Sequence, residues 1–227
     1  MAHQVSPLTT RRSLLAGTAA TAVLLLPGCQ SLERINLVEA IRRLLLLSAQ
    51  RAFAMLTAPG GFWDRSVTRL ALPDVFNGRG MVLERILTSA IVKERLQREF
   101  NHVAEDGARR AAPAVADAVQ LIGVENALAI LRGGPTAATD LLRGNMGRRL
   151  VEVMVPALGD GLRVASDPVV AQALNALTGV DLSGVASRFA LDVDNAIWGE
   201  IGRQEGAIRA DPASTNDPLL IAAFKLL

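Results

Sequence analysis

The sequence predicts an all-α protein, a single multi-helix globular domain that follows a cleaved signal peptide. Past residue 30, apolar residues recur at spacings of three and four, the period of one face of an α-helix. No segment keeps the alternation of apolar and polar residues that a half-buried β-strand requires. Aromatic residues make up 4% of the chain and tyrosine is absent, so we expect a core of aliphatic side chains and methionine.

The first 28 residues are predicted to be the signal peptide and not part of the fold. Arg11 and Arg12 form its basic start, and an uncharged run rich in Ala and Leu extends from Ser13 to Pro27. This run is about 15 residues long, shorter than the roughly 20 residues that a membrane-spanning helix needs. Residues 10–15 resemble a twin-arginine export signal, with a leucine where that pattern favours phenylalanine.

Cys29 is the only cysteine of the chain, and it directly follows the apolar run. Residues 26–29, Leu-Pro-Gly-Cys, resemble a bacterial lipobox, in which a signal peptidase cuts before the cysteine and the thiol is lipidated. The resemblance implies a lipid anchor at Cys29, a tether over 29–36 and a domain over 37–227. Gln30 stands where an aspartate would imply inner-membrane retention, which favours the periplasmic face of the outer membrane. Cleavage without lipidation and a retained anchor are the alternatives.

The charge of the mature chain argues against binding to nucleic acid. The full chain has 24 basic and 22 acidic residues, but residues 1–28 hold two arginines and no acid. The remainder therefore has 22 of each sign and no net charge. Paired arginines such as Arg109-Arg110 have acids nearby, so no basic face is expected and nucleic acid is excluded as a partner.

The first predicted helix covers residues 32–57, and the stretch 58–61, Ala-Pro-Gly-Gly, ends it. Residues 62–73 lack a clear period and are predicted to form a connecting loop or a short extended segment. Within this loop, Phe62 and Trp63 are expected to fill the core, with an exposed aromatic anchor as the alternative.

Two helices are predicted next, over 82–97 and over 99–120, the second broken or bent near Gly107 and Pro113. A short helix over 124–131 should end at the Gly-Gly-Pro stretch of residues 133–135. That stretch superficially resembles a phosphate loop, but it follows a helix and lacks the Lys-Ser/Thr ending, so a helix stop and turn explain it better.

The remaining helices begin at recognisable caps. Thr136 is expected to cap a helix that runs to about residue 165, bent near Pro156. Asp167-Pro168 opens a helix up to Gly179, a long helix covers 181–210, and a last short helix begins at Asp217.

Several stretches together resemble the bacterial DUF4197 family, whose members are exported proteins of unknown function. The resemblance covers nearly all of residues 37–227 and implies an exported helical domain without implying an activity. The stretches that carry it are GGFWDRSVTRLALP at 60–73, FNHVAEDGA at 100–108, ALAILRGGPTAAT at 127–139, LVEVMVPAL at 150–158 and AIRADP at 207–212.

Four polar residues within these stretches form a candidate buried cluster or pocket: Asn101, Glu105, Thr139 and Arg209. Asn101 and Glu105 lie one turn apart and project from the same helix face. A buried carboxylate requires a cation or several donors, and Arg209 is the partner we predict for Glu105. The cluster could be structural or line a ligand pocket.

His102 is the only histidine after the signal peptide, and it shares a helix side with Glu99 and Glu105. Glu-x-x-His is how helical bundles present di-metal ligands, but such sites take a second histidine, so no metal site is predicted. The mature chain has only Lys93 and Lys225 as further bases and lacks Gly-x-Ser-x-Gly. We therefore predict no catalytic residues and no cofactor.

These observations predict a lipid-anchored periplasmic domain that acts by binding or as a scaffold. Its expected partners are the membrane, through the lipid anchor, and either an envelope protein or a small ligand. The alternative is a small-ligand-binding protein or hydrolase that uses the polar residues Asn101, His102 and Glu105.

Overall fold

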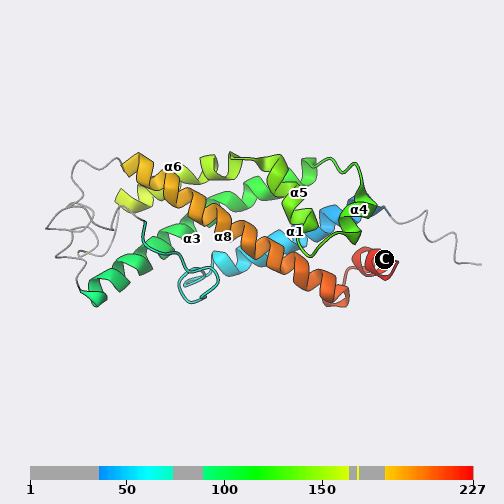
Figure 1. Ribbon diagram of the computed structural model, residues 1–227, viewed down its shortest axis with the longest axis horizontal. Helices are drawn as coiled ribbons and strands as arrows, with labels where there is room; N and C mark the ends of the chain where they lie inside the picture. Colours follow the sequence, from blue (N-terminus) through cyan, green and yellow to red (C-terminus); the bar gives the residue numbers. More distant parts are fainter. Residues whose placement is uncertain (1–35, 74–88, 164–167, 169–181, 227) are drawn as a thin grey trace, which may run out of the picture. The chain divides into compact units, whose positions relative to one another are not determined.

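The computed structural model describes residues 36–73, 89–163, 168 and 182–226. Regular structure in these ranges is helical throughout, without a strand, so the all-α prediction is confirmed (Figure 1). The described residues all belong to one compact unit. The predicted export signal with Arg11 and Arg12, the lipidation site Cys29, and residues 169–179 of the predicted helix after Asp167 lie outside the described residues.

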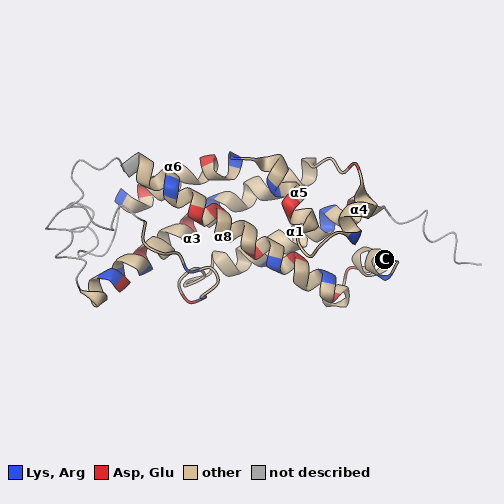
Figure 2. Ribbon diagram, viewed as in Figure 1, with Lys and Arg blue, Asp and Glu red and all other residues tan. Residues whose placement is uncertain are grey.

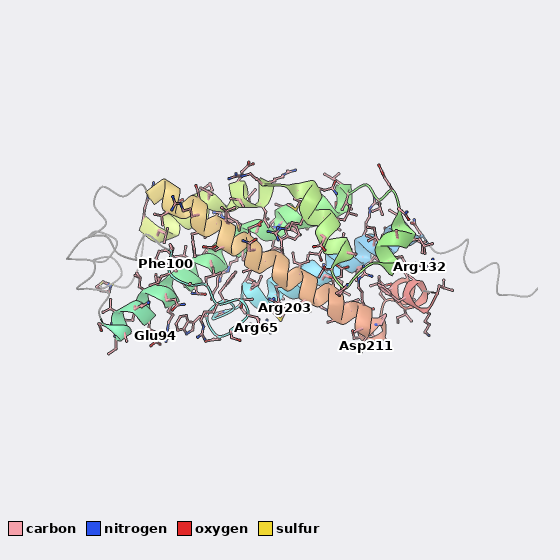
Figure 3. All side chains as sticks on the ribbon, in the orientation of Figure 1. Arg65, Glu94, Phe100, Arg132, Arg203 and Asp211 are labelled. Carbon is pink, nitrogen blue, oxygen red and sulfur yellow. The ribbon has the colours of Figure 1, made fainter. Side chains whose placement is uncertain are left out.

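Four long helices build the core: α1 (Leu37–Leu56), α3 (Ala90–Leu121), α6 (Arg149–Arg163) and α8 (Leu182–Ala210). Helices α1 and α3 are antiparallel, because Arg109 of α3 donates to the Thr57 carbonyl just after α1, whereas Arg42 near the start of α1 donates to the Ile122 carbonyl just after α3. Phe100 of α3 and Phe189 of α8 meet edge to face, with ring centroids 5.1 Å apart. Figure 3 labels Phe100 on α3.

Two glycines allow α3 and α6 to approach closely. A Cβ atom on Gly107 of α3 would lie 2.7 Å from Cδ2 of Leu158, and one on Gly161 of α6 would lie 2.8 Å from Cγ1 of Val103. Both distances are shorter than van der Waals contact allows, so a side chain at either position would force Leu158 or Val103 to move. The two contacts also show that α6 runs antiparallel to α3.

Shorter helices close the bundle: α4 (Ala127–Arg132), α5 (Ala137–Met146), the 3-10 helix η2 (Pro212–Thr215) and α9 (Pro218–Lys225). Asn126 caps α4 by accepting from the N–H of Ala129, and Asp217 caps α9 by accepting from Leu219 and Leu220. The predicted cap at Asp217 is therefore confirmed. The predicted end of the long helix at Ala210 is also confirmed, as the last residue of α8.

The structure differs from the sequence prediction in two places. Helix α3 runs without interruption from Ala90 to Leu121. We predicted a boundary near residue 98 and a break or bend near Gly107 and Pro113; the boundary and a break are wrong. Conversely, the single helix predicted from Thr136 to about residue 165 is two helices, α5 and α6. They separate at Gly147, whose positive φ of 54° is a conformation that glycine adopts without strain.

Over the described ranges, no helix is both long and apolar enough to cross a bilayer.

Candidate functional site

Asn101 is fully buried and fixes the loop that follows α1. Its Oδ1 accepts the Leu70 N–H at 2.8 Å, and its Nδ2 donates to the Leu70 carbonyl at 3.0 Å and to the Gln97 carbonyl at 2.7 Å. Gln97 Nε2 also donates to the Leu70 carbonyl, at 2.9 Å. One side chain of α3 thus satisfies both backbone groups of a buried loop residue, which holds the loop against the helix.

Glu105 lies one turn further along α3 and is 2% exposed. Its Oε1 accepts the Gly60 N–H at 2.9 Å, and its Oε2 lies 3.2 Å from His102 Nδ1 and 3.8 Å from an Arg109 guanidinium nitrogen. Gly60 has a positive φ of 77°, and a Cβ there would lie 2.0 Å from a carboxylate oxygen of Asp64. Only glycine can therefore turn its N–H toward Glu105 at this point of the loop.

A groove of about 510 Å³ lies between α8 and the loop that connects α1 to α3, at residues 67–73 of that loop. One wall is the segment 67–73, whose Leu70 backbone is hydrogen-bonded to Asn101. The other wall is α8 at Asp192, Asn195 and Ala196. Asn195 is held in turn by Arg143 of α5, whose guanidinium also donates to Asp194 at 3.1 Å. Both walls are therefore fixed by side chains from neighbouring helices.

The two aromatic residues of the loop have different environments. Phe62 is fully buried, as predicted, and belongs to the core. Trp63 is half-buried, with the guanidinium of Arg69 4.5 Å and that of Arg98 5.1 Å from its ring. Cation–π contacts of this kind stabilise an exposed tryptophan by about 0.5–1 kcal/mol each.

Arg65 of the same loop approaches the buried Glu200 of α8 at 3.9 Å, and Arg203 contacts the same carboxylate at 2.5 Å. Figure 3 shows Arg65 and Arg203 next to each other. Arg65 therefore joins the loop after α1 to Glu200 of α8, while Arg203 pairs with Glu200 from the same helix. The sequence pattern did not reveal this contact.

Thr139 and Arg209 belong to a second site, organised by a residue that we did not single out. Glu205 of α8 is fully buried and accepts from the N–H groups of Ala138 and Thr139 and from the Thr139 hydroxyl, at 2.6–3.0 Å. Its Oε1 also accepts from Arg209 Nε at 2.7 Å.

The predicted pairing of Glu105 with Arg209 is therefore wrong. Arg209 lies one turn after Glu205 on the same helix and reaches it at i,i+4 spacing, while its other nitrogens donate to the carbonyls of Leu131 and Ile130 at the end of α4. Glu105, in contrast, faces the loop after α1. The structure divides the four predicted residues into two pairs, Asn101 with Glu105 and Thr139 with Arg209.

Glu205 acts as the cap of α5 from another helix. Thr136 occupies the predicted N-cap position, but its hydroxyl donates to Asp140 and does not accept from the backbone of α5. The carboxylate of Glu205 takes that place, where the helix dipole also favours negative charge. Gly202 on α8 makes the approach possible, since a Cβ there would lie 2.9 Å from the Thr136 side chain.

Asp194, also missed from the sequence, is 6% exposed and accepts from the Trp198 indole N–H at 2.9 Å. Burial raises the pKa of Asp194 above its ordinary value, although the positive charge of Arg143 and the two hydrogen bonds lower it in part. The folded state therefore binds this proton more tightly than the unfolded state does.

We expect this linkage to appear as a pH-dependent difference between the wild type and Asp194→Asn. The contribution of Asp194 to the free energy of unfolding should fall as pH rises from about 4 through its raised pKa, because the folded state must then give up a proton that it holds more tightly. Asparagine keeps an acceptor for Trp198 but does not ionise. Urea unfolding of both proteins between about pH 3.5 and 7 measures the difference.

Asp217 provides a control of opposite sign. Burial tends to raise its pKa, but the N–H groups of the α9 cap and Arg43 lower it overall. The stability that Asp217 contributes is therefore present above about pH 4 and lost below it, so the difference between wild type and Asp217→Asn should rise with pH. A difference for Asp194→Asn that stays constant or rises with pH would contradict the expected linkage.

A histidine such as His102 binds a metal ion only together with further ligands. Among the described residues, no three histidine, cysteine or acidic side chains lie close enough together to hold a metal ion. His102 itself is 59% exposed and contacts Glu105.

Fold and site together define a helical domain whose buried acids fasten loops and helix ends to one another. The chain belongs to the DUF4197 family, described as proteins of unknown function, which matches residues 31–225. The family resemblance found in the sequence is thereby confirmed. No match was found among curated proteins or among solved structures.

Proposed function

We propose that this chain is a lipid-anchored protein of the bacterial envelope that acts by binding. The observation that carries the proposal is the position of Cys29 at the end of a short apolar run behind two arginines. The family match begins at residue 31, immediately after the proposed anchor. We place the protein on the periplasmic face of the outer membrane, because Gln30 lacks the charge associated with retention in the inner membrane.

Binding is favoured over catalysis by what the buried polar groups contact. Asn101 binds backbone groups of Leu70, Glu105 binds the Gly60 N–H, and Glu205 binds the start of α5. Groups with their hydrogen bonds satisfied in this way stabilise a surface and are not poised for proton transfer. The groove between residues 67–73 and α8 is the surface that Asn101 supports through Leu70, and we propose it as the site for a small ligand or an envelope protein.

The second candidate is a hydrolase that uses His102 as a base. The observation in its favour is the contact between His102 Nδ1 and Glu105 Oε2 at 3.2 Å, since a buried carboxylate orients a catalytic histidine in the same manner. Over the described ranges, however, no serine or threonine hydroxyl contacts His102. A histidine without a nucleophile beside it supports acid–base chemistry only on a substrate that supplies its own attacking group.

The anchor is tested by Cys29→Ser. We expect the variant to leave the membrane fraction, because it lacks the thiol that would carry the acyl chains, each worth about 0.8 kcal/mol per buried CH₂ group. Fractionation of cells that express wild type and variant at equal levels measures the change. Mass spectrometry of the N-terminal peptide of the wild type should show the added mass of the lipid on Cys29.

Gln30→Ser is the matched control, since it changes the neighbouring residue and keeps the thiol; it should remain with the membrane. Retention of Cys29→Ser in the membrane pellet to the same degree as wild type would overturn the proposed lipid anchor.

A further inference from the structure

Three large apolar side chains are exposed at one end of the domain. Leu121, the last residue of α3, is 81% exposed, Leu128 of α4 is 40% exposed, and Leu226, directly after α9, is 41% exposed. Single exposed leucines are ordinary, but three from three different helix ends at the same end of a bundle require an explanation.

This end is the one at which α1 begins. Arg42, in the second turn of α1, donates to the Ile122 carbonyl next to Leu121. Helix α1 also packs against α4 and α9, and Arg43 pairs with Asp217 at the start of α9. Figure 1 shows the start of α1, the end of α3, α4 and α9 gathered together.

The chain that precedes α1 is short. Asn36 lies seven positions after Cys29, and a chain of this length reaches at most about 25 Å when fully extended. A lipid on Cys29 would therefore hold the start of α1 within that distance of the bilayer, and with it the end of the domain that carries the three leucines. Such a tether raises the effective concentration of the membrane at this end, so that a small apolar contact suffices for docking.

We propose that the end of the domain that carries Leu121, Leu128 and Leu226 docks onto the bilayer surface in which Cys29 is anchored. This inference rests on the proposed lipid anchor and adds the orientation of the domain to it. Leucine side chains enter the boundary between headgroups and acyl chains, while the groove beside residues 67–73 faces away from the membrane.

The charged residues near the three leucines are of both signs, and the exposed acid Asp117 lies one turn before Leu121. Arg132, one turn after Leu128, and Lys225, next to Leu226, are both exposed and lie at the ends of α4 and α9. Figure 3 shows Arg132 at this end, and Figure 2 shows the basic and acidic residues of the long helices interspersed. Anionic phospholipid headgroups attract such cations. Glu125 is an exposed acid of the same region, so the leucines and not a net charge must provide most of the contact.

The test compares the two ends of α3, using the full chain purified from its own membrane and reconstituted into phosphatidylethanolamine–phosphatidylglycerol vesicles. Leu121→Cys and Ile91→Cys replace exposed leucine and isoleucine side chains about 45 Å apart on the same helix. Because a lipidated Cys29 has no free thiol, each variant carries one site for an environment-sensitive fluorophore. Lipids with a nitroxide on a shallow acyl carbon then report contact with the bilayer.

We expect the label at residue 121 to lose fluorescence to the nitroxide and to shift to shorter wavelength, with the label at 91 unaffected. Leu128→Cys should behave as Leu121→Cys. Equal quenching at 91 and 121, or quenching at 91 alone, on a chain whose Cys29 carries lipid would overturn this inference and leave the anchor intact. An unmodified Cys29 on a chain that does not sediment with vesicles would overturn the anchor and the docking together.

Discussion

Replacing Glu205 by glutamine should destabilise the protein by about 3–5 kcal/mol, the cost of breaking a buried ion pair from one side. Both carboxylate oxygens accept hydrogen bonds: Oε1 from Ala138 and Arg209, and Oε2 from the N–H and the hydroxyl of Thr139. Glutamine has nearly the same shape, but one of the two oxygens is replaced by an NH₂ group. That NH₂ group would point at N–H or O–H donors and could not accept their hydrogen bonds. Arg209, with a side chain 10% exposed, would also lose its only carboxylate partner among the described residues.

Urea or guanidinium unfolding measures this effect, and the chain offers a matched control. Glu94 and Arg98 on α3 form a pair with the same i,i+4 spacing, but their side chains are 57% and 61% exposed. Glu94→Gln should therefore change the stability by less than about 1 kcal/mol. Equal effects of Glu205→Gln and Glu94→Gln would mean that burial adds nothing to the first pair.

A double-mutant cycle separates the two buried glutamates. Arg209→Met should be strongly non-additive with Glu205→Gln, since the two side chains are in contact. It should be additive with Glu105→Gln, because Glu105 contacts Gly60, His102 and Arg109 instead. Coupling of Glu105 and not of Glu205 to Arg209 would contradict the arrangement of the two sites.

The helical class and several helix ends could be predicted from the sequence because local signals determine them. The Ala-Pro-Gly-Gly stretch after α1 and the Asp-Pro pairs at 211–212 and 217–218 each end or begin a helix through the chemistry of neighbouring residues. Helix α8 was predictable to its last residue for the same reason.

The two errors in the fold arise where packing decides. Gly107 and Pro113 are poor helix formers, yet α3 passes through both. At Gly107 the absence of a Cβ gives room to Leu158 of α6, which the sequence alone does not reveal. Gly147 breaks the α5–α6 run at a position where the sequence also contains Gly144, and nothing local distinguishes the two glycines. Only the positive φ required by the turn selects Gly147.

The sequence predicted which residues of the candidate site are buried, but not which of them contact one another. Asn101, Glu105 and Thr139 are buried, and Arg209 is nearly so, which their positions in the family stretches indicated. Glu205 was missed, although its spacing of four from Arg209 is a signal that sequence inspection can detect. That it caps α5 depends on how closely α8 crosses Thr136, which is a property of the assembled fold.

Replacing Asn101 by leucine should destabilise the protein by about 2–4 kcal/mol, the second-largest effect we expect. The substitution keeps a side chain branched at Cγ but removes the acceptor of the buried Leu70 N–H and one of the two donors to the Leu70 carbonyl. Each buried backbone group left without its partner costs about 1–3 kcal/mol. Because residues 67–73 form one wall of the groove, the same change should loosen the attachment of that segment to α3.

Asn145→Leu is the matched control for this effect. Asn145 of α5 donates to the carbonyl four residues before it at 2.8 Å, just as Asn101 does to Gln97, but Asn145 is exposed and contacts no loop. Its replacement should change the stability by no more than about 0.5 kcal/mol. Hydrogen exchange gives the local readout: the Leu70 amide should exchange faster in Asn101→Leu than the global loss of stability predicts, because its protection comes from Asn101 alone. If Asn101→Leu is no more destabilising than Asn145→Leu and the Leu70 amide keeps its protection, then Asn101 does not hold the groove wall, and the buried amide must be assigned a role other than fastening the loop.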